Sequence, residues 1–344
     1  MPKDNMLTLF ENEYPAGVFY HTDILNPRPT ALSRRRAQRV NAPRQQPNED
    51  LPGGVEECRL CNPEKLKNNP TLEFLLDRKV ANFPNADPFL PYDQRVIMLW
   101  HDDREIRKKK FHIYKLEDIR REELYYGLKA TIELGKRFIE EPLRTTDLPR
   151  MVVGLNLGRL AGQTIPHIHT QYGWEIVMIK EKVTENRLNL YYEELEEQQL
   201  ILNKDDGDEK VRVIAPWTPK GQYQLDLHFN GKYEIHKLEE EDIRLFAHLA
   251  DRVLKHYVSN LAIQNVNIVF KSSPLGRSIA PVIASIVPRV NMPAMYEIVG
   301  IDVVDKFPGD IAAEFRKINW REEINKGREY DPESSLKNIL EESK

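Results

Sequence analysis

The chain contains little cysteine, no long apolar run and no excess of positive charge. Two cysteines among 344 residues cannot build the disulfide framework of a small secreted scaffold. No apolar stretch approaches the roughly 20 residues that span a membrane, and the N-terminus lacks the apolar core of a signal peptide. A net charge of −4 disfavours a general nucleic-acid-binding protein. We therefore expect a cytoplasmic globular protein with no nucleic-acid or membrane partner.

The composition, 40% hydrophobic and 30% charged, is that of an ordinary globular protein with one large core or two moderate domains. Residues 26–57 are rich in Pro, Arg, Gln and Asn and predict an extended arm that ends at the turn 51–54. Short apolar runs predict buried strands at 96–100 and 151–156. Helical spacing of apolar residues between 116 and 139 predicts an amphipathic helix. The polar run 204–210 indicates a surface loop.

A weak internal repeat relates residues 111–119 to residues 233–243. Each segment precedes a long amphipathic helix, the second over roughly 244–258, and a strand follows at 166–172 and at 280–290. The repeat predicts a duplicated α+β unit, each copy an antiparallel sheet with helices packed on it. Chance similarity of two such segments is the alternative. The second copy has no histidine over 279–289, so we expect the reaction in the first half.

Cys58-x-x-Cys61 can place two thiolates on one tetrahedral ion. Two reduced structural cysteines in a turn are the alternative, and a thioredoxin-like redox pair is disfavoured because no βαβ pattern surrounds them. Zinc needs two further ligands, for which His112 and His167 are the candidates. Alone, His112 would be a solvated residue at a strand end. A site with four protein ligands leaves no open position for a substrate, so the ion would be structural.

The segment His167-Ile-His169-Thr-Gln171 follows a glycine-containing run from Asn156 to Pro166. Two histidines separated by one residue on an extended segment point to the same side. We expect the glycine run to supply backbone N–H groups and space for a phosphate, and Gln171 to contact the group that a histidine attacks. Neutral imidazole is a good nucleophile toward phosphorus at pH 7, and its attack on an α-phosphorus would give a covalent nucleotidyl-histidine. His169 is the candidate nucleophile, with a hydrogen-bonded core histidine as the alternative.

The pattern Asn-x-Gly-x-x-x-Gly-x-Thr-x-Pro-His-x-His-x-Gln resembles the active-site signature of galactose-1-phosphate uridylyltransferases, the nucleotidyltransferase branch of the histidine-triad superfamily. Ser33-x-x-Arg36-Ala-x-Arg39 is similar to the family's N-terminal arginine segment, although alone it would be a solvated basic patch. The Cys pair and His112 resemble the first three zinc ligands, and residues 296–302 resemble a late family segment. The similarity covers about residues 25–320 and is specific in the first half.

The resemblance implies a role for each matching residue. His169 would hold the nucleoside monophosphate, Gln171 and Thr164 would bind the transferred phosphate, and Asn156 would contact the nucleotide's phosphate or ribose. The remaining nucleotide-binding candidates are Arg36, Arg39, Asn82 and Gly162. One structural zinc would be bound by Cys58, Cys61, His112 and His167. The implied fold is a duplicated antiparallel half-barrel with packed helices, usually as a homodimer.

The sequence also departs from the family pattern in its C-terminal half. Studied members bind a second metal through one glutamate and three histidines, but only Glu185 has a counterpart here, so a second metal is doubtful. Asp302 replaces the sugar-contacting glutamate, and Pro308 or a neighbour replaces a nearby glutamine. Recognition of galactose therefore does not carry over.

The resemblance divides the chain into four parts. They are an N-terminal arm with the arginine segment (1–57), a catalytic histidine-triad-like half (58–200), a degenerate second half (201–325) and a polar C-terminal tail (326–344). The leading hypothesis is a ping-pong nucleotidyltransferase that moves a nucleoside monophosphate between a nucleotide sugar and a sugar 1-phosphate. A nucleotide-sugar or dinucleotide polyphosphate phosphorylase, using inorganic phosphate as acceptor, is the second. A non-catalytic nucleotide-binding protein is the third.

Overall fold

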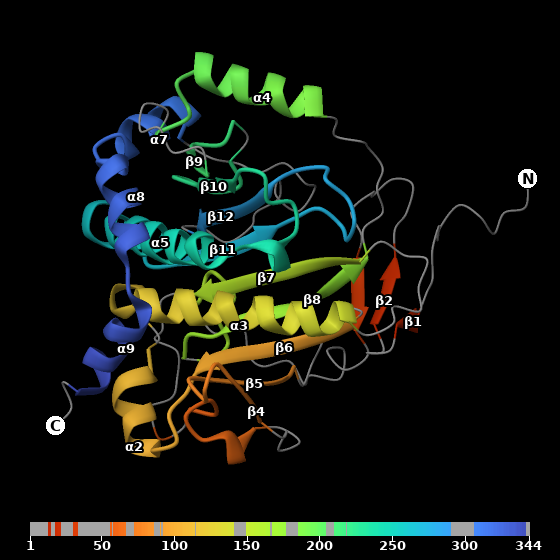
Figure 1. Ribbon diagram of the computed structural model, residues 1–344. Helices are drawn as coiled ribbons and strands as arrows, with labels where there is room; N and C mark the ends of the chain where they lie inside the picture. Colours follow the sequence, from red (N-terminus) through yellow and green to blue (C-terminus); the bar gives the residue numbers. More distant parts are fainter. Residues whose placement is uncertain are drawn as a thin grey trace, which may run out of the picture.

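A nine-stranded antiparallel sheet organises the chain, and two long helices cover one of its faces (Figure 1). The structure is a computed structural model. The residues that it describes are 13–14, 18–21, 30–33, 56, 58–66, 72–85, 90, 92–113, 115–140, 149–165, 167–176, 185–203, 210–217, 219–289 and 306–341.

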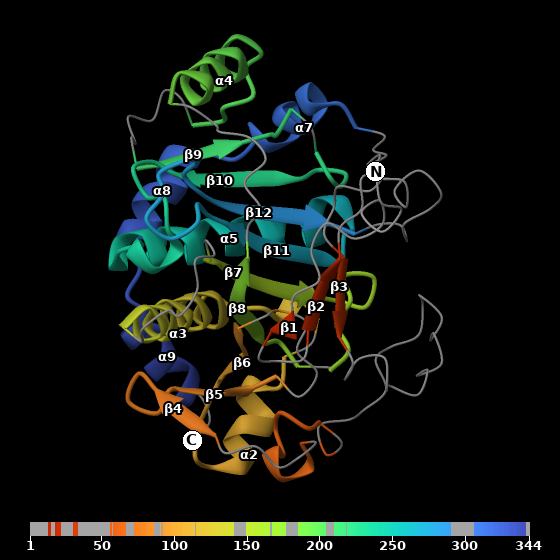
Figure 2. The ribbon, with the colours of Figure 1, turned by 90° about the vertical axis from the view of Figure 1, so that its right-hand side faces the viewer.

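The strands of the large sheet follow the order β4-β5-β6-β8-β7-β11-β12-β10-β9, which Figure 2 shows from β9 at the top to β4 below. Their bounds are β4 Glu73–Leu75, β5 Val80–Pro84, β6 Tyr92–Leu99, β7 Pro149–Leu157, β8 Thr170–Ile176, β9 Val211–Ile214, β10 Leu225–Phe229, β11 Val266–Lys271 and β12 Val282–Pro288. Both strands predicted from short apolar runs are present, as β6 and β7. The strand expected over 166–172 begins only at Thr170, so His167 and His169 lie just before it.

The order of the strands contains the predicted duplication. In the first half the chain order β5, β6, β7, β8 becomes the sheet order β5-β6-β8-β7, and in the second half β9, β10, β11, β12 becomes β9-β10-β12-β11. The two halves join where β7 pairs with β11. Helix α3 (Arg121–Glu140) lies between the second and third of these strands in the first half, and α5 (Glu240–Leu261) does so in the second. Each helix follows a short 3-10 turn, η5 (Leu116–Asp118) or η7 (Ile235–Lys237). The expected α+β fold of duplicated units is confirmed.

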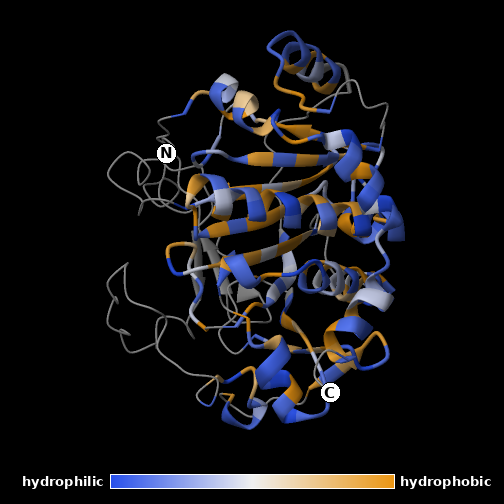
Figure 3. Cartoon of the chain, turned by 90° about the vertical axis from the view of Figure 1, so that its left-hand side faces the viewer, coloured by the Kyte–Doolittle hydropathy of each residue, from blue (hydrophilic) through white to orange (hydrophobic). Residues whose placement is uncertain are grey.

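The main core lies between the sheet and the helices α3 and α5. Along β7 every second residue is buried, so that Met151, Val153 and Leu155 point to the core and the residues between them point to the opposite face. Helix α3 packs so closely that a Cβ on Gly127 would lie 2.4 Å from Oγ1 of Thr170. Figure 3 shows this helix-covered side, with apolar strands behind helices that carry many hydrophilic residues. The other face, away from α3 and α5, is called the open face below.

A small three-stranded sheet, β1 (Glu13–Tyr14), β2 (Val18–His21) and β3 (Thr30–Ser33), lies on the open-face side of the molecule (Figures 1 and 2). The described part of the predicted arm thus includes one paired strand, β3. The expected surface loop 204–210 lies almost wholly outside the described residues.

The shorter helical elements flank the sheet. They are η3 (Pro63–Lys65), α2 (Arg104–Ile106), η4 (Arg107–Phe111), α4 (Glu185–Glu197), α7 (Pro308–Phe315), α8 (Trp320–Glu329) and α9 (Pro332–Glu341). Helix α8 packs on α5, and α9 packs on α3. The segment predicted as a polar tail from residue 326 is thus helical over much of its described length, and it places Tyr330 and Leu336 in the core. None of the described helices is long and apolar enough to cross a membrane.

Candidate active site and metal centre

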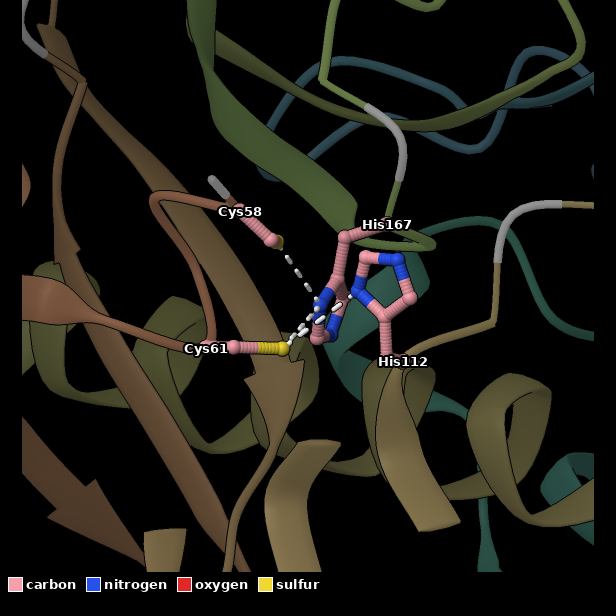
Figure 4. A group of neighbouring side chains, drawn as sticks. All are labelled: Cys58, Cys61, His112 and His167. Atoms are coloured by element: carbon pink, nitrogen blue, oxygen red, sulfur yellow. Dashed lines mark hydrogen bonds between the residues drawn. The ribbon is translucent and has the colours of Figure 1, made fainter. Parts of the chain in front are cut away.

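Four side chains from three distant segments converge into one cluster (Figure 4). Nδ1 of His167 lies 3.6 Å from Sγ of Cys58 and 3.5 Å from Sγ of Cys61, and Nδ1 of His112 lies 3.4 Å from Sγ of Cys61. Tetrahedral zinc, with bonds of about 2.3 Å to sulfur and 2.05 Å to nitrogen, holds neighbouring sulfur and nitrogen ligands about 3.5 Å apart. The residues predicted as metal ligands thus lie together at separations that fit one bound ion.

Local hydrogen bonds explain why these segments meet. The backbone N–H and side-chain Nδ2 of Asn62 both donate to the carbonyl of Cys58, which closes the turn that holds the two sulfurs. Nε of Arg104, in α2, donates to Oδ1 of Asn62 and ties the turn to the helices before His112. His112 ends η4, and the N–H of Ile168 donates to the carbonyl of the next residue, Ile113. The backbone therefore holds His112 and His167 side by side.

The two neighbouring thiols shift each other's pKa in opposite directions. The Cys61 thiol, together with His112 and His167, lowers the pKa of Cys58 through hydrogen bonds to its sulfur. The same contact and burial raise the pKa of Cys61. Both cysteines are buried, and among the described residues no disulfide joins them. Two sulfurs and two imidazole nitrogens form a donor set that zinc prefers, and a bound cation would hold both sulfurs as thiolates.

His169 has its tautomer fixed by the backbone. Nδ1 donates to the carbonyl of His167 at 2.8 Å, so the lone pair of the neutral ring lies on Nε2. Nε2 lies 3.4 Å from Nε2 of Gln171, whose amide can donate to it or to a neighbouring oxygen. Burial lowers the pKa of His169, which is 7% exposed. Burial therefore favours the neutral ring, the form in which Nε2 carries the lone pair.

The register of the sheet places Gln171 and Asn156 on the open face. Gln171 pairs with Gly154 on β7, and Asn156 lies two residues further along the same face of that strand. Since Gly154 has no side chain, the surface in front of Gln171 remains open. The structure thus brings together His169, Gln171 and Asn156, as predicted from the sequence, beside the metal cluster.

Several backbone N–H groups of the glycine run are bound within the fold. The N–H of Gly158 donates to Oε1 of Gln163, the N–H of Gln163 to the carbonyl of Gly158, and the N–H of Gly162 to the carbonyl of Arg159. The N–H of Leu160 donates to Oδ1 of Asn265 from the second half. These four N–H groups are bound within the fold, so a phosphate at this run would have to use other N–H groups of the run. Gly162 and Thr164 lie at exposed positions of this run.

Asn82 lies on the other face of the sheet from Gln171. It pairs with Ile97, which pairs with Thr170, and Thr170 points to α3. Its side chain is fully buried, donating to the carbonyl of Glu73 and accepting from Arg95. The structure therefore does not bring the Asn82 amide together with His169, and the role of Asn82 in nucleotide binding stays a prediction.

Other predicted residues fall at or beyond the limits of the described chain. Arg36, Arg39 and Asp302 lie outside the described residues. Glu185 begins α4, and Pro308 is the first residue of α7. Among the described residues, one group of metal-binding side chains was found, the cluster around Cys58.

Three residues of the site were missed in the sequence: Gln163, Asn265 and Asn267. Gln163 braces the glycine run from inside, and the two asparagines reach it from β11 and the residue before it. The alternation of polar and apolar residues in Asn265-Val-Asn267-Ile indicates one polar strand face, but nothing in the sequence says that this face meets the first half. A cavity of about 880 Å³ lies elsewhere, between α3 and η7, and none of the site residues lines it.

The fold is shared with solved structures of nucleotide-processing enzymes. An ADP-glucose phosphorylase from Arabidopsis thaliana with bound ADP-glucose aligns at 17% identity over 87% of this chain and 98% of its own, with a TM-score of 0.56. A uridylyltransferase aligns at 14% over 89% and 98%, also with a TM-score of 0.56. A GalT-like protein from A. thaliana aligns at 18% over 70% and 84%, with a TM-score of 0.50. No family model and no curated protein sequence matches the chain. The likeness to these structures therefore holds at the level of the fold.

Proposed function

We propose that this protein transfers nucleoside monophosphates through a covalent intermediate on Nε2 of His169. The observation that carries the proposal is the geometry of that ring: Nδ1 is bound to a backbone carbonyl, and Nε2 faces the amide of Gln171 on the open face. A neutral imidazole with a fixed tautomer and an adjacent amide donor is suited to attack phosphorus. The shared fold of a nucleotide-sugar phosphorylase and a uridylyltransferase supports this choice of chemistry.

In the first step, the lone pair of His169 Nε2 attacks the α-phosphorus of a nucleotide sugar. The P–N bond forms as the P–O bond to the second phosphate breaks, and a sugar 1-phosphate leaves with the electron pair. Gln171 would donate its N–H to a non-bridging oxygen of the transferred phosphate. In the second step, a phosphate oxygen of the acceptor attacks the same phosphorus, the P–N bond breaks and the neutral imidazole is regenerated.

The metal centre would support this chemistry by holding residues 167–169, just before β8, in place. Zinc bound by Cys58, Cys61, His112 and His167 supplies a structural crosslink, because four protein ligands leave no position for a substrate. We propose one zinc per chain and, since Glu185 has no partner histidines over 279–289, no second metal. Metal analysis of the purified protein tests both numbers. The homodimer implied by the family resemblance is tested by light scattering.

The proposal has two versions, which differ in the molecule that accepts the nucleoside monophosphate. With a sugar 1-phosphate as acceptor, the enzyme is a hexose-1-phosphate uridylyltransferase-like transferase. With inorganic phosphate, it is a phosphorylase that releases a nucleoside diphosphate, and the bound ADP-glucose in one structure of this fold favours keeping that version. A nucleotide-binding protein without turnover is disfavoured, because such a protein has no need of a nucleophile.

The decisive experiment looks for the covalent adduct. The protein is incubated with UDP-, ADP- and GDP-sugars labelled at the α-phosphate and examined by intact mass after denaturation. We expect the mass of one nucleoside monophosphate, absent in His169→Ala and present in the matched control His236→Ala, whose ring lies on the helix-covered side. An adduct in His169→Ala would contradict the mechanism. Adding inorganic phosphate or hexose 1-phosphates to the adduct then distinguishes phosphorylase from transferase.

A further inference from the structure

The second half of the sheet presents an arginine, Arg289, to the same face as the nucleophile. We propose that Arg289 binds the phosphate that leaves with the sugar in the first step and that attacks in the second, a phosphate monoester or inorganic phosphate. This inference rests on the proposed function and extends it to the half of the chain that lacks histidines. It makes the second half part of the phosphate site.

Arg289 is anchored through its backbone and Nε, and no contact of Nη1 or Nη2 with another described residue is found. Its backbone N–H donates to the carbonyl of Asn265, and its Nε donates to Oδ1 of Asn267 at 2.6 Å. It is partly buried, and it forms no ion pair with a carboxylate among the described residues. One nitrogen is thus used to fix the direction of the side chain, while Nη1 and Nη2 can bind two oxygens of one phosphate.

The contact with Asn267 continues to the residues of the first half. Nδ2 of Asn267 donates to Oδ1 of Asn156 and to the carbonyl of Ala161, both at 2.8 Å. Because Oδ1 of Asn156 accepts this bond, its own Nδ2 is left as a donor. Arg289 therefore orients Asn267, and Asn267 orients Asn156. The amide of Asn156 is then a donor beside His169.

The register of the strands gives the distance between the nucleophile and the guanidinium. Thr170 pairs with Leu155, so His169 lies beside Asn156, and Asn156 pairs with Asn267 on the next strand. Two strand spacings separate the backbone at His169 from that at Asn267, about 10 Å. Side chains extend over the sheet from both ends of this interval. A diphosphate fits in it, with its α-phosphorus at His169 and its second phosphate at Arg289.

The hydrogen bonds of the glycine run indicate why a cation is useful at the second phosphate. Its N–H groups at Gly158, Leu160, Gly162 and Gln163 are bound within the fold and cannot neutralise a second phosphate. A departing phosphate monoester carries close to two negative charges, which a neutral amide stabilises less than a guanidinium does. Among the described residues, Arg289 is placed on the open face where a side-chain cation could supply this interaction.

The test separates phosphate binding from support of the fold. Arg289→Met, Arg289→Lys and the matched control Arg321→Met, an exposed residue of α8, are compared for binding of inorganic phosphate and glucose 1-phosphate by calorimetry. We expect the methionine variant to weaken both affinities by about 10-fold or more, the lysine variant to weaken them less, and the control to match the wild type. If the methionine variant does not fold, the lysine variant still decides, because loss of the bidentate contact is expected to weaken binding by about 3-fold or more. Unchanged phosphate affinity in the folded variants would overturn the proposal.

A second readout uses two donors of the nucleotide. A nucleotide sugar must release a phosphate, whereas a nucleoside 5′-phosphorimidazolide releases imidazole and makes no use of Arg289. We expect Arg289→Met to slow adduct formation from the nucleotide sugar by about 100-fold and to affect the phosphorimidazolide far less. Equal losses with both donors would show that Arg289 only supports Asn156, against the proposal. If the wild type forms no adduct with either donor while Arg289 still governs phosphate affinity, the nucleotidyl-histidine fails and the phosphate site stands.

Discussion

Nδ1 of His169 donates to the backbone carbonyl of His167, and the side chain of that same His167 points to the sulfurs of Cys58 and Cys61. One residue therefore contacts both the metal cluster and the nucleophile. The position of its carbonyl fixes the tautomer of the His169 ring. Any change that releases the His167 side chain from the cluster also moves the group that orients His169. A metal bound to this cluster would thus act on the proposed reaction through a single peptide unit.

Removal of the metal is expected to reduce adduct formation although no metal contacts the substrate. We expect about one zinc per chain in the wild type and almost none in Cys61→Ser, because loss of one ligand of four weakens a structural site strongly. The variant should form the adduct at least about 10-fold more slowly, since outer contacts of this kind are worth 10- to 100-fold. Metal analysis and adduct formation are measured on the same samples. Full activity in a zinc-free sample would contradict the coupling.

The sequence was sufficient for features that depend on local patterns. The apolar runs at β6 and β7 and the spacing in α3 are signals of one element each, and the Cys-x-x-Cys pair needs only a turn. The duplication was visible because each copy keeps its own turn and helix. These parts of the fold and the metal ligands were therefore predictable from the residues.

Features that depend on register or long-range packing were not predictable. A shift of one residue along a strand reverses the face, and Asn82 lies on the helix-covered side for that reason. Asn267 and Asn156 are 111 residues apart in the sequence, so no local pattern predicts their contact. The polar composition after residue 326 hides the few apolar residues, such as Leu336, that fix α9 to the core.

Replacement of Gln171 should slow the transfer without changing the fold. In Gln171→Leu the amide that faces Nε2 of His169 is lost, and with it one donor to the charged oxygens of the reacting phosphate. Loss of one such donor typically costs about 100-fold or more in rate. Rapid quenching measures the rate of adduct formation, and Gln198→Leu, at an exposed position in the turn after α4, is the matched control. A rate for Gln171→Leu within 3-fold of the wild type, about 0.7 kcal/mol, would refute the role of the amide.

Two glycines of the loop before His167 should respond differently to alanine. Both have positive φ, 83° at Gly158 and 88° at Gly162, so each substitution carries a conformational cost of about 1 to 2 kcal/mol. A Cβ at Gly158 would also lie 2.4 Å from Oδ1 of Asn265, whereas none of the described atoms lies within 4 Å of one at Gly162. Gly158→Ala should therefore lose more stability toward urea than Gly162→Ala. Equal free energies of unfolding would show that the contact with Asn265 is not tight.

The protein should lose stability as the pH is lowered, because of a histidine far from the candidate active site. His248, on α5, is buried between Arg121, whose guanidinium faces its Nδ1 at 3.2 Å, and Glu323 of α8, whose carboxylate faces its Nε2 at 2.8 Å. Burial, together with the nearby charge of Arg121, lowers the pKa of His248, against the opposing effect of Glu323. The folded state therefore takes up this proton at lower pH than the unfolded state, in which the pKa is about 6.5. Stability is lost as pH falls below about 6.5, with a slope of at most about 1.4 kcal/mol per pH unit from this one group.

His248→Gln keeps a donor and an acceptor but does not titrate, so its free energy of unfolding in urea should fall less steeply between pH 6.5 and 5. Parallel curves for the two proteins would assign the acid sensitivity to other groups.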